Sequence, residues 1–226
     1  MGAFRKYLAD KCLTFTGVNQ SLTITMTGVS RVFEYSYDKD TWVRYTGGAI
    51  PFQNDTLYLR GDNPSGLSTG TNSKVVFSFG GTSEVYCSGN IMHLLNHMED
   101  LVEIPCNYCF YQLFADCRVL RSAPDLPATT LKANCYYYMF RQCTYLVSAP
   151  VLPAKTLVSN CYSYMFNGCT NLNYIKALFT TTPSNTYTNA WVQKVASSGT
   201  FVKASDATWN VTGNNAVPNK WTVIKE

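Results

Sequence analysis

CFYQLFADCRVLRSAPDLPATTLKAN at residues 109–134 is followed directly by CYYYMFRQCTYLVSAPVLPAKTLVSN at 135–160 and by CYSYMFNGCTNL from Cys161. The first two segments are identical at 14 of 26 aligned positions, so the chain repeats with a period of 26 residues as far as Leu178. A fixed period of this length is typical of architectures whose units cannot bury their apolar faces alone and therefore stack on one another.

Spacings that recur from unit to unit predict the local structure of each unit. Cys135, Met139 and Cys143 stand four residues apart, which places them on one face of a helix, with Phe140 beside them. An extended segment at 146–150 follows, and the prolines at unit positions 16 and 19 end it. We therefore expect one short helix, one short strand and a proline-marked turn in each unit.

The motif C-Y-x-Y-M-F-x-x-C-T-x-L-x-x-A-P-x-L-P-A-x-T-L resembles the BspA-like leucine-rich repeats of gut bacterial surface proteins and of phages that infect those bacteria. The resemblance is strong from Cys87 to Asn173, and the tail from Trp191 to Val223 is similar to the terminal segment of that family. It implies a leucine-rich-repeat fold and a role in adhesion or binding rather than catalysis.

A different pattern fills the part of the chain before the repeats. Apolar and polar residues alternate there with period two, and turn residues such as Gly, Asn and Asp bound each run, as in β-strands of a sandwich. Six such runs lie at 13–16, 22–27, 32–37, 41–45, 56–60 and 74–79.

Together these patterns predict an α+β fold, in which an N-terminal antiparallel β-sandwich precedes a short capped leucine-rich-repeat solenoid of 26-residue units. Cys87-Ser-Gly-Asn-Ile-Met matches the opening of a unit, so an atypical first repeat is expected there. The predicted parts are the β-sandwich at 1–86, the N-terminal capping repeat at 87–108, the leucine-rich repeats at 109–178 and the C-terminal cap at 179–226.

Composition narrows the classes of partner. Charged residues make up 14% of the chain and the net charge is +4, without a run of like charges, so we expect no nucleic-acid partner. No apolar run reaches the roughly 18 residues of a membrane helix, so no membrane insertion is expected. The opening MGAFRKYLADKCLTFTG lacks the apolar core of a secretory signal, which favours assembly inside a cell.

Few residue patterns indicate chemistry. His93, His97, Cys106 and Cys109 have the residue types of a zinc site, but Cys109 is already explained by the repeat. Arg60-Gly61-Asp62 is better explained as the turn that ends a strand than as an integrin ligand. No motif of a nucleophile, phosphate loop or carboxylate pair is present. We expect no enzyme activity, no metal and no cofactor.

The nine cysteines include six that recur in register in the repeats. Their odd number and the missing signal favour buried free thiols, which behave as small apolar side chains. Whether any of them forms a disulfide stays open, because equivalent cysteines of neighbouring units would stack at roughly 5 Å, the spacing of strands.

Unit positions that vary between repeats are the candidate ligand contacts. One set, expected beside the strand, consists of Arg121, Tyr145, Val147 and Asn173. Tyr137 and Tyr138 are alternatives on the expected helix side. The competing interpretation is an ordinary solvated face with some tyrosines turned inward.

Two functions remain as expectations. In the first, the protein is a bacteriophage virion component of a tail, fibre or capsid decoration, assembled in the host cytoplasm, with other virion proteins or a host surface protein or glycan as partners. In the second, it is an exported BspA-like adhesin on a bacterial cell surface that binds host protein or glycan. A homo-oligomer is compatible with either function, although no heptad pattern argues for one.

Overall fold

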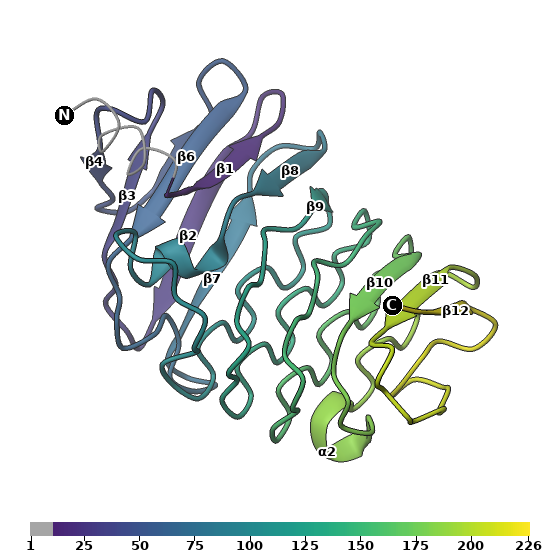
Figure 1. The fold of residues 1–226 in the computed structure, drawn as a ribbon. Helices are drawn as coiled ribbons and strands as arrows, with labels where there is room; N and C mark the ends of the chain where they lie inside the picture. Colours follow the sequence, from purple (N-terminus) through teal and green to yellow (C-terminus); the bar gives the residue numbers. More distant parts are fainter. Residues whose placement is uncertain (1–10) are drawn as a thin grey trace.

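A computed structural model of the chain describes residues 11–226, which are built almost entirely from β-strands and turns (Figure 1). In this range the helices are a 3-10 helix, η1 (Ile91–Leu94), and one α-helix, α2 (Asn185–Thr188), each of four residues. The predicted α+β class with a leucine-rich-repeat solenoid is therefore wrong: residues 11–226 are 30% strand and 4% helix, with mixed sheets. None of these helices is long and apolar enough to cross a membrane.

Two sheets form the N-terminal half. One has six strands in the order β4-β3-β6-β1-β8-β9, and the other has three in the order β5-β2-β7. Each of the six predicted runs contains a strand, while β5 and β8 were not predicted. The bounds are β1 (Leu13–Thr16), β2 (Ser21–Thr27), β3 (Phe33–Ser36), β4 (Val43–Arg44), β5 (Ala49–Pro51), β6 (Thr56–Gly61), β7 (Lys74–Phe79), β8 (Val85–Ser88) and β9 (Leu120–Ser122).

Aromatic side chains join the two sheets. Phe15 of β1 and Phe33 of β3 lie in one sheet, and their ring centroids are 6.3 Å and 6.0 Å from that of Phe77 in β7 of the other. All three rings are fully buried. Because such rings remove a large apolar area from water, they hold the sheets face to face.

The larger sheet continues into the repeats. Most of its strand pairs are antiparallel, but β8 pairs with β9 in parallel, and β9 belongs to the first 26-residue unit. Phe77 also contacts Phe114 of that unit, at 5.4 Å between ring centroids. One hydrophobic core therefore runs from the sheets into the repeats.

Each unit opens with a run of overlapping β-turns where a helix was predicted. In the first unit the N–H of Tyr111 donates to the C=O of Tyr108, and that of Leu113 donates to the C=O of Phe110; the same i+3 to i pattern continues to Cys117. These residues form what we call the turn run. It uses only every second N–H, so half of its donors remain for other partners.

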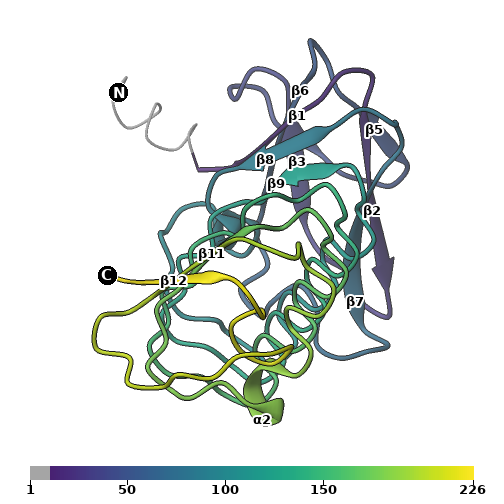
Figure 2. The ribbon, with the colours of Figure 1, turned by 90° about the vertical axis from the view of Figure 1, so that its right-hand side faces the viewer.

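The remaining donors join one unit to the next. The N–H groups of Phe110, Gln112 and Phe114 donate to the C=O groups of Cys135, Tyr137 and Met139, with N–O distances of 2.8, 3.1 and 2.9 Å. The second unit is bonded to the third in the same way. Figure 2, which looks along the array, shows the successive units lying one behind another.

A left-handed residue at every fourth position explains why this is not a helix. Within the second unit the φ angles of Asn134, Tyr138 and Gln142 are +57°, +61° and +61°, values outside the right-handed helical region. The turn run therefore advances four residues per repeat of its conformation, close to the 3.6 residues of an α-helix. Over nine residues, an apolar spacing of four fits both structures.

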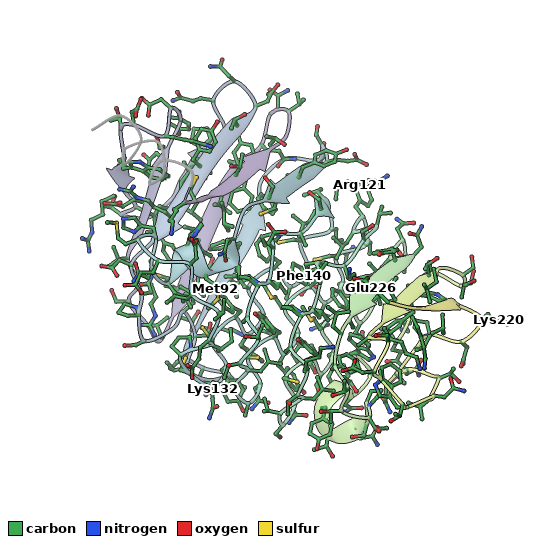
Figure 3. The ribbon with its side chains drawn as sticks, in the orientation of Figure 1. Met92, Arg121, Lys132, Phe140, Lys220 and Glu226 are labelled. Carbon is green, nitrogen blue, oxygen red and sulfur yellow. The ribbon has the colours of Figure 1, made fainter. Side chains whose placement is uncertain are left out.

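Stacked aromatic rings fill the interior of the array. Phe114, Phe140 and Phe166 form one column, with successive centroids 5.4 Å and 5.8 Å apart and nearly parallel ring planes. Figure 3 shows Phe140 in the interior of the array, between Arg121 near one edge and Lys132 near another. A second column consists of Phe110, Tyr136 and Tyr162.

The repeat cysteines are buried free thiols, as predicted. Each second cysteine of a unit also makes a hydrogen bond that was not predicted. The Sγ atoms of Cys143 and Cys169 donate to the C=O groups of Phe114 and Phe140 in the preceding unit, both at 3.0 Å. These thiols therefore reinforce the contact between units.

Three parallel strands end the chain: β10 (Tyr174–Ala177), β11 (Thr200–Lys203) and β12 (Thr222–Lys225). Tryptophans cover the last unit there. The ring of Trp191 lies 6.2 Å from that of Tyr162 and 6.1 Å from that of Phe166, at the end of both aromatic columns. Its indole N–H donates to the C=O of Ala216, so its polar atom is satisfied.

Candidate functional site

Four tyrosines of three successive units, and one directly before the first unit, lie together along the turn runs. We call them the tyrosine cluster: Tyr108, Tyr111, Tyr137, Tyr138 and Tyr164. Stacking of the 26-residue units places equivalent or adjacent unit positions side by side, so tyrosines distant in sequence become neighbours. Four of the five are half-buried, and Tyr111 is buried.

The rings of the cluster are in mutual contact. The centroids of Tyr137 and Tyr138 are 4.4 Å apart in an edge-to-face arrangement, and Tyr138 is 4.9 Å from Tyr164. Tyr111 lies 5.9 Å from Tyr137 and 5.7 Å from Tyr108. These separations are within the range of favourable aromatic pairs, so the rings hold one another in place.

Cationic and amide groups border the rings. The guanidinium of Arg141 lies 5.4 Å from the ring centroid of Tyr138, and the ammonium of Lys74 lies 5.6 Å from that of Tyr111. Lys74 also donates to Oε1 of Gln112 at 2.7 Å. The cluster therefore combines flat apolar surface with hydrogen-bond donors and positive charge.

The hydroxyls of Tyr111 and Tyr137 stay protonated at neutral pH. Burial raises the pKa of Tyr137 further above its ordinary value, and the hydrogen bond with Tyr138 acts in the same direction. Burial also raises the pKa of Tyr111. Neutral hydroxyls can both donate and accept hydrogen bonds, so these groups can serve polar ligand atoms of either kind.

The six predicted contact residues fall on two segments of the units. Tyr137 and Tyr138 belong to the tyrosine cluster. Val147 and Asn173 are adjacent on the strand segment, where the N–H of Asn173 donates to the C=O of Val147 at 2.9 Å.

The other two predicted residues lie near that strand segment. Arg121 is in β9, and its guanidinium is 3.6 Å from the carboxylate of Glu84. Tyr145 has 42% of its surface exposed, and its N–H donates to the C=O of Arg118. No ring contact joins this second set to the cluster among residues 11–226.

Two of the five clustered tyrosines, Tyr137 and Tyr138, were predicted from the sequence. Tyr111 and Tyr164 occupy the same unit positions as Tyr137 and Tyr138, respectively, so the signal for them was the repeat register itself. Tyr108 precedes its unit by one residue and had no such signal. In a helix, the side chains at these positions would point in other directions than in the turn run. Their contact could therefore not be predicted.

A hollow beside the strand segment is an alternative site. A hollow of about 300 Å³ is lined by Asp125, Leu126 and Pro127 of the first unit and by Val151 and Pro153 of the second. Its lining is apolar apart from one carboxylate and contains neither an aromatic ring nor a cation. It provides fewer specific contacts than the tyrosine cluster.

The four residues weighed as a zinc site are not brought together. Nε2 of His93 is 3.0 Å from a carboxylate oxygen of Asp100, and Nδ1 of His97 is 3.1 Å from the C=O of Gly61. Cys106 and Cys109 instead face each other. Within residues 11–226 no group of three or more His, Cys, Asp or Glu side chains could hold a metal ion.

The Arg60-Gly61-Asp62 tripeptide is not displayed as a free loop. Arg60 and Gly61 end β6. The guanidinium of Arg60 lies 3.9 Å from the ring centroid of Trp42 and donates to the carboxylate of Glu34 at 2.8 Å. Both contacts occupy the side chain that an integrin-type ligand would present.

No family model, no curated protein and no solved structure matches this sequence.

Proposed function

We propose that this chain is a non-catalytic binding protein that uses the tyrosine cluster to contact a protein or glycan on a cell surface. The observation that carries the proposal is the contact of five tyrosine rings across three units, bordered by Arg141 and Lys74. Tyr and Arg dominate the energetic centres of binding surfaces, because they supply large contact area together with hydrogen bonds.

Preorganisation supports this role. Rings held by edge-to-face contacts lose little conformational freedom when a ligand binds, which lowers the entropic cost of association. The backbone beneath them is fixed by hydrogen bonds between units, for example from Tyr138 N–H to Ser163 C=O at 3.1 Å. A rigid binding surface of this kind suits the recognition of a ligand. It suits catalysis less well, because a chemical step needs groups that titrate.

The setting we propose first is a phage virion, with an exported bacterial adhesin as the alternative. The thiols of Cys143 and Cys169 donate buried hydrogen bonds between units, a role that requires the reduced form. Reduced thiols persist in the cytoplasm, where virions assemble. This feature supports the virion setting over export.

Binding to intact cells tests the proposal. Labelled protein is titrated onto gut bacterial cells and onto mucin-coated surfaces, alongside the double variant Tyr137→Ala/Tyr138→Ala. We expect saturable binding that the double variant weakens at least tenfold, since central aromatic anchors each contribute about 2 kcal/mol or more. The matched control is Tyr145→Ala, an exposed tyrosine outside the cluster, which should bind as the wild type does.

Each outcome of this experiment bears on the proposal. Saturable binding to bacterial cells supports the virion setting, whereas binding to mucin alone supports the adhesin. Periodate treatment of the bound surface abolishes a glycan contact, and protease treatment abolishes a protein contact. Equal binding by the double variant and the wild type, or no saturable binding to either surface, overturns the proposed function.

A further inference from the structure

Two cysteines that lie side by side in a Cys-x-x-Cys segment differ from the other thiols of the chain. Cys106 and Cys109 precede and open the first turn run, and the sulfurs of both lie beside Gly66. Cys109 is fully buried, whereas Cys106 is half-buried. The pair therefore combines one cysteine that keeps some exposed surface with one that is protected from solvent.

The loop that carries Gly66, Leu67 and Ser68 encloses the pair. The Sγ of Cys106 lies 3.5 Å from the C=O of Ser68, and the N–H of Ser68 donates to the C=O of Cys109 at 3.0 Å. These contacts hold both cysteines against the end of the N-terminal sheets.

A glycine creates the space for the two sulfurs. Gly66 has a φ of +94°, which disfavours any other residue. A Cβ at this position would overlap the Sγ of Cys106 and lie 3.3 Å from the Sγ of Cys109. Both sulfurs therefore lie close to one point beside Gly66, and a short movement can bring them to the distance of a disulfide bond.

The electrostatic surroundings of the two thiols are opposite. The hydrogen bond from Cys109 and the positive charge of Arg31 lower the pKa of Cys106, although burial opposes them. Burial raises the pKa of Cys109 well above its ordinary value. Since the thiolate is the attacking species, Cys106 is the more reactive of the two.

We propose that Cys106 and Cys109 form a thiol–disulfide exchange site for small-molecule disulfides, with Cys106 as the attacking residue and Cys109 as the resolving residue. Cys106 keeps part of its surface exposed, which provides the approach for such a molecule.

The exchange proceeds in two balanced steps. The Cys106 thiolate attacks one sulfur of the external disulfide, so that a mixed disulfide forms and the first external thiol leaves with the proton from Cys106. Cys109 then attacks the Sγ of Cys106, its proton passes to the second leaving thiol, and an intramolecular disulfide remains. The protein is oxidised by two electrons, and the external disulfide is reduced to two thiols.

Mass spectrometry of the protein in glutathione buffers tests this site. After incubation with oxidised glutathione and alkylation of the remaining thiols, we expect the peptide with Cys106 and Cys109 to be unalkylated and lighter by two hydrogens. Cys109→Ser should accumulate a mixed disulfide on Cys106, and Cys106→Ser should form neither product. The control Cys135→Ser, which removes a fully buried repeat thiol, should leave the intramolecular disulfide unchanged.

Two results would overturn the assignment. One is wild-type protein whose Cys106 and Cys109 both remain alkylatable in oxidised glutathione. The other is a disulfide that still forms in Cys106→Ser, which would assign the chemistry to a different thiol. The wild-type measurement does not depend on the folding of any variant.

Discussion

Tyr136 carries a buried hydroxyl without a hydrogen-bond partner, although its ring fits the column between Phe110 and Tyr162. The same position in the first unit is phenylalanine, so the column does not require the oxygen. Leaving such a group unpaired costs about 1–3 kcal/mol relative to a structure in which it is satisfied.

Tyr136→Phe should therefore leave the free energy of unfolding unchanged or raise it by roughly 1 kcal/mol, because an unsatisfied oxygen is removed without loss of ring packing. Urea denaturation measures this change. Tyr45→Phe is the matched control: its hydroxyl oxygen lies 2.8 Å from the C=O of Gly48 and 3.1 Å from that of Ile24, so its one proton has a buried acceptor and its loss should destabilise the protein by about 1 kcal/mol. Equal losses in both variants would contradict the interpretation.

His93 predicts a pH dependence of stability. Burial lowers its pKa below the ordinary 6.5, while Asp100 opposes this change and the charges of Lys11 and His97 act with burial. Its Nδ1 is buried and without a partner, so protonation would add an unsatisfied donor. At this site the unfolded chain therefore binds a proton more readily than the folded chain, which lowers the free energy of unfolding at acidic pH. Above the pKa of the unfolded state neither state binds the proton, so the loss of stability disappears.

We expect the urea midpoint to be constant above about pH 7 and to fall as the pH drops below about 6.5 towards the folded pKa, since only the unfolded state gains the proton there. His93→Gln should flatten this decline. His97→Gln removes only the last and smallest contribution to the lowered pKa of His93, so this variant should retain most of the decline. A midpoint that rises on acidification through this range would refute the assignment.

The turn run is the element that distinguishes this chain from a helical repeat protein. Its left-handed positions fall every fourth residue, and the last of them in successive units is Asp116, Gln142 and Gly168. Gly adopts positive φ without the penalty of about 1–2 kcal/mol that other residues incur.

Gln142→Gly should therefore raise the free energy of unfolding by roughly 0.5–1 kcal/mol, because the backbone strain at its φ of +61° is relieved. The reverse change, Gly168→Gln, should destabilise the protein, since the φ of +81° at this position strains any residue other than glycine. Denaturant midpoints of both variants check the pair. Stabilisation by Gly168→Gln would exclude this account of the turn run.

The strands could be predicted from sequence, whereas the turn run could not. Alternation such as Leu22-Thr-Ile-Thr-Met-Thr requires a strand, and β2 is there. The apolar spacing at Cys135, Met139 and Cys143 fits two conformations with similar periods. Asn134 and Gly168, residue types that tolerate positive φ, were the available signal for turns, but Tyr138 and Gln142 obscured it.

The candidate site was predictable to a similar extent. Tyr137 and Tyr138 were identifiable as variable positions, but their contact with Tyr111 and Tyr164 depends on how closely the units stack. That closeness follows from hydrogen bonds between backbone atoms of neighbouring units, which side-chain patterns do not encode. The positions of Arg121 and Tyr145 away from the cluster follow from the same geometry.

At the scale of the whole molecule, one hydrophobic core joins the sheets, the repeats and the C-terminal strands. Phe114 is central to this continuity, because its ring contacts Phe77 of β7 on one side and Phe140 of the next unit on the other, both at 5.4 Å. A core of this kind favours cooperative unfolding.

Phe114→Ala should lower the free energy of unfolding by about 3–5 kcal/mol, the usual effect of removing a buried aromatic ring. Circular dichroism and tryptophan fluorescence should give coincident transitions in the wild type, since Trp42 lies in the N-terminal half and Trp191 beyond the repeats. Tyr145→Ala, at an exposed position, should change stability by less than about 0.5 kcal/mol. Separate transitions for the two probes would contradict a single cooperative unit.

The ladder of hydrogen bonds between turn runs also has a genetic consequence. Each run offers the same row of carbonyls to one neighbour and the same row of N–H groups to the other, so a unit fits between any two of its kind. Recombination that copies the codons for Cys135–Asn160 in frame inserts one more layer and leaves both ends of the molecule intact. Each such duplication thus increases the distance between the N-terminal sheets and the C-terminal strands by the thickness of one unit. The row of tyrosines lengthens by the same step.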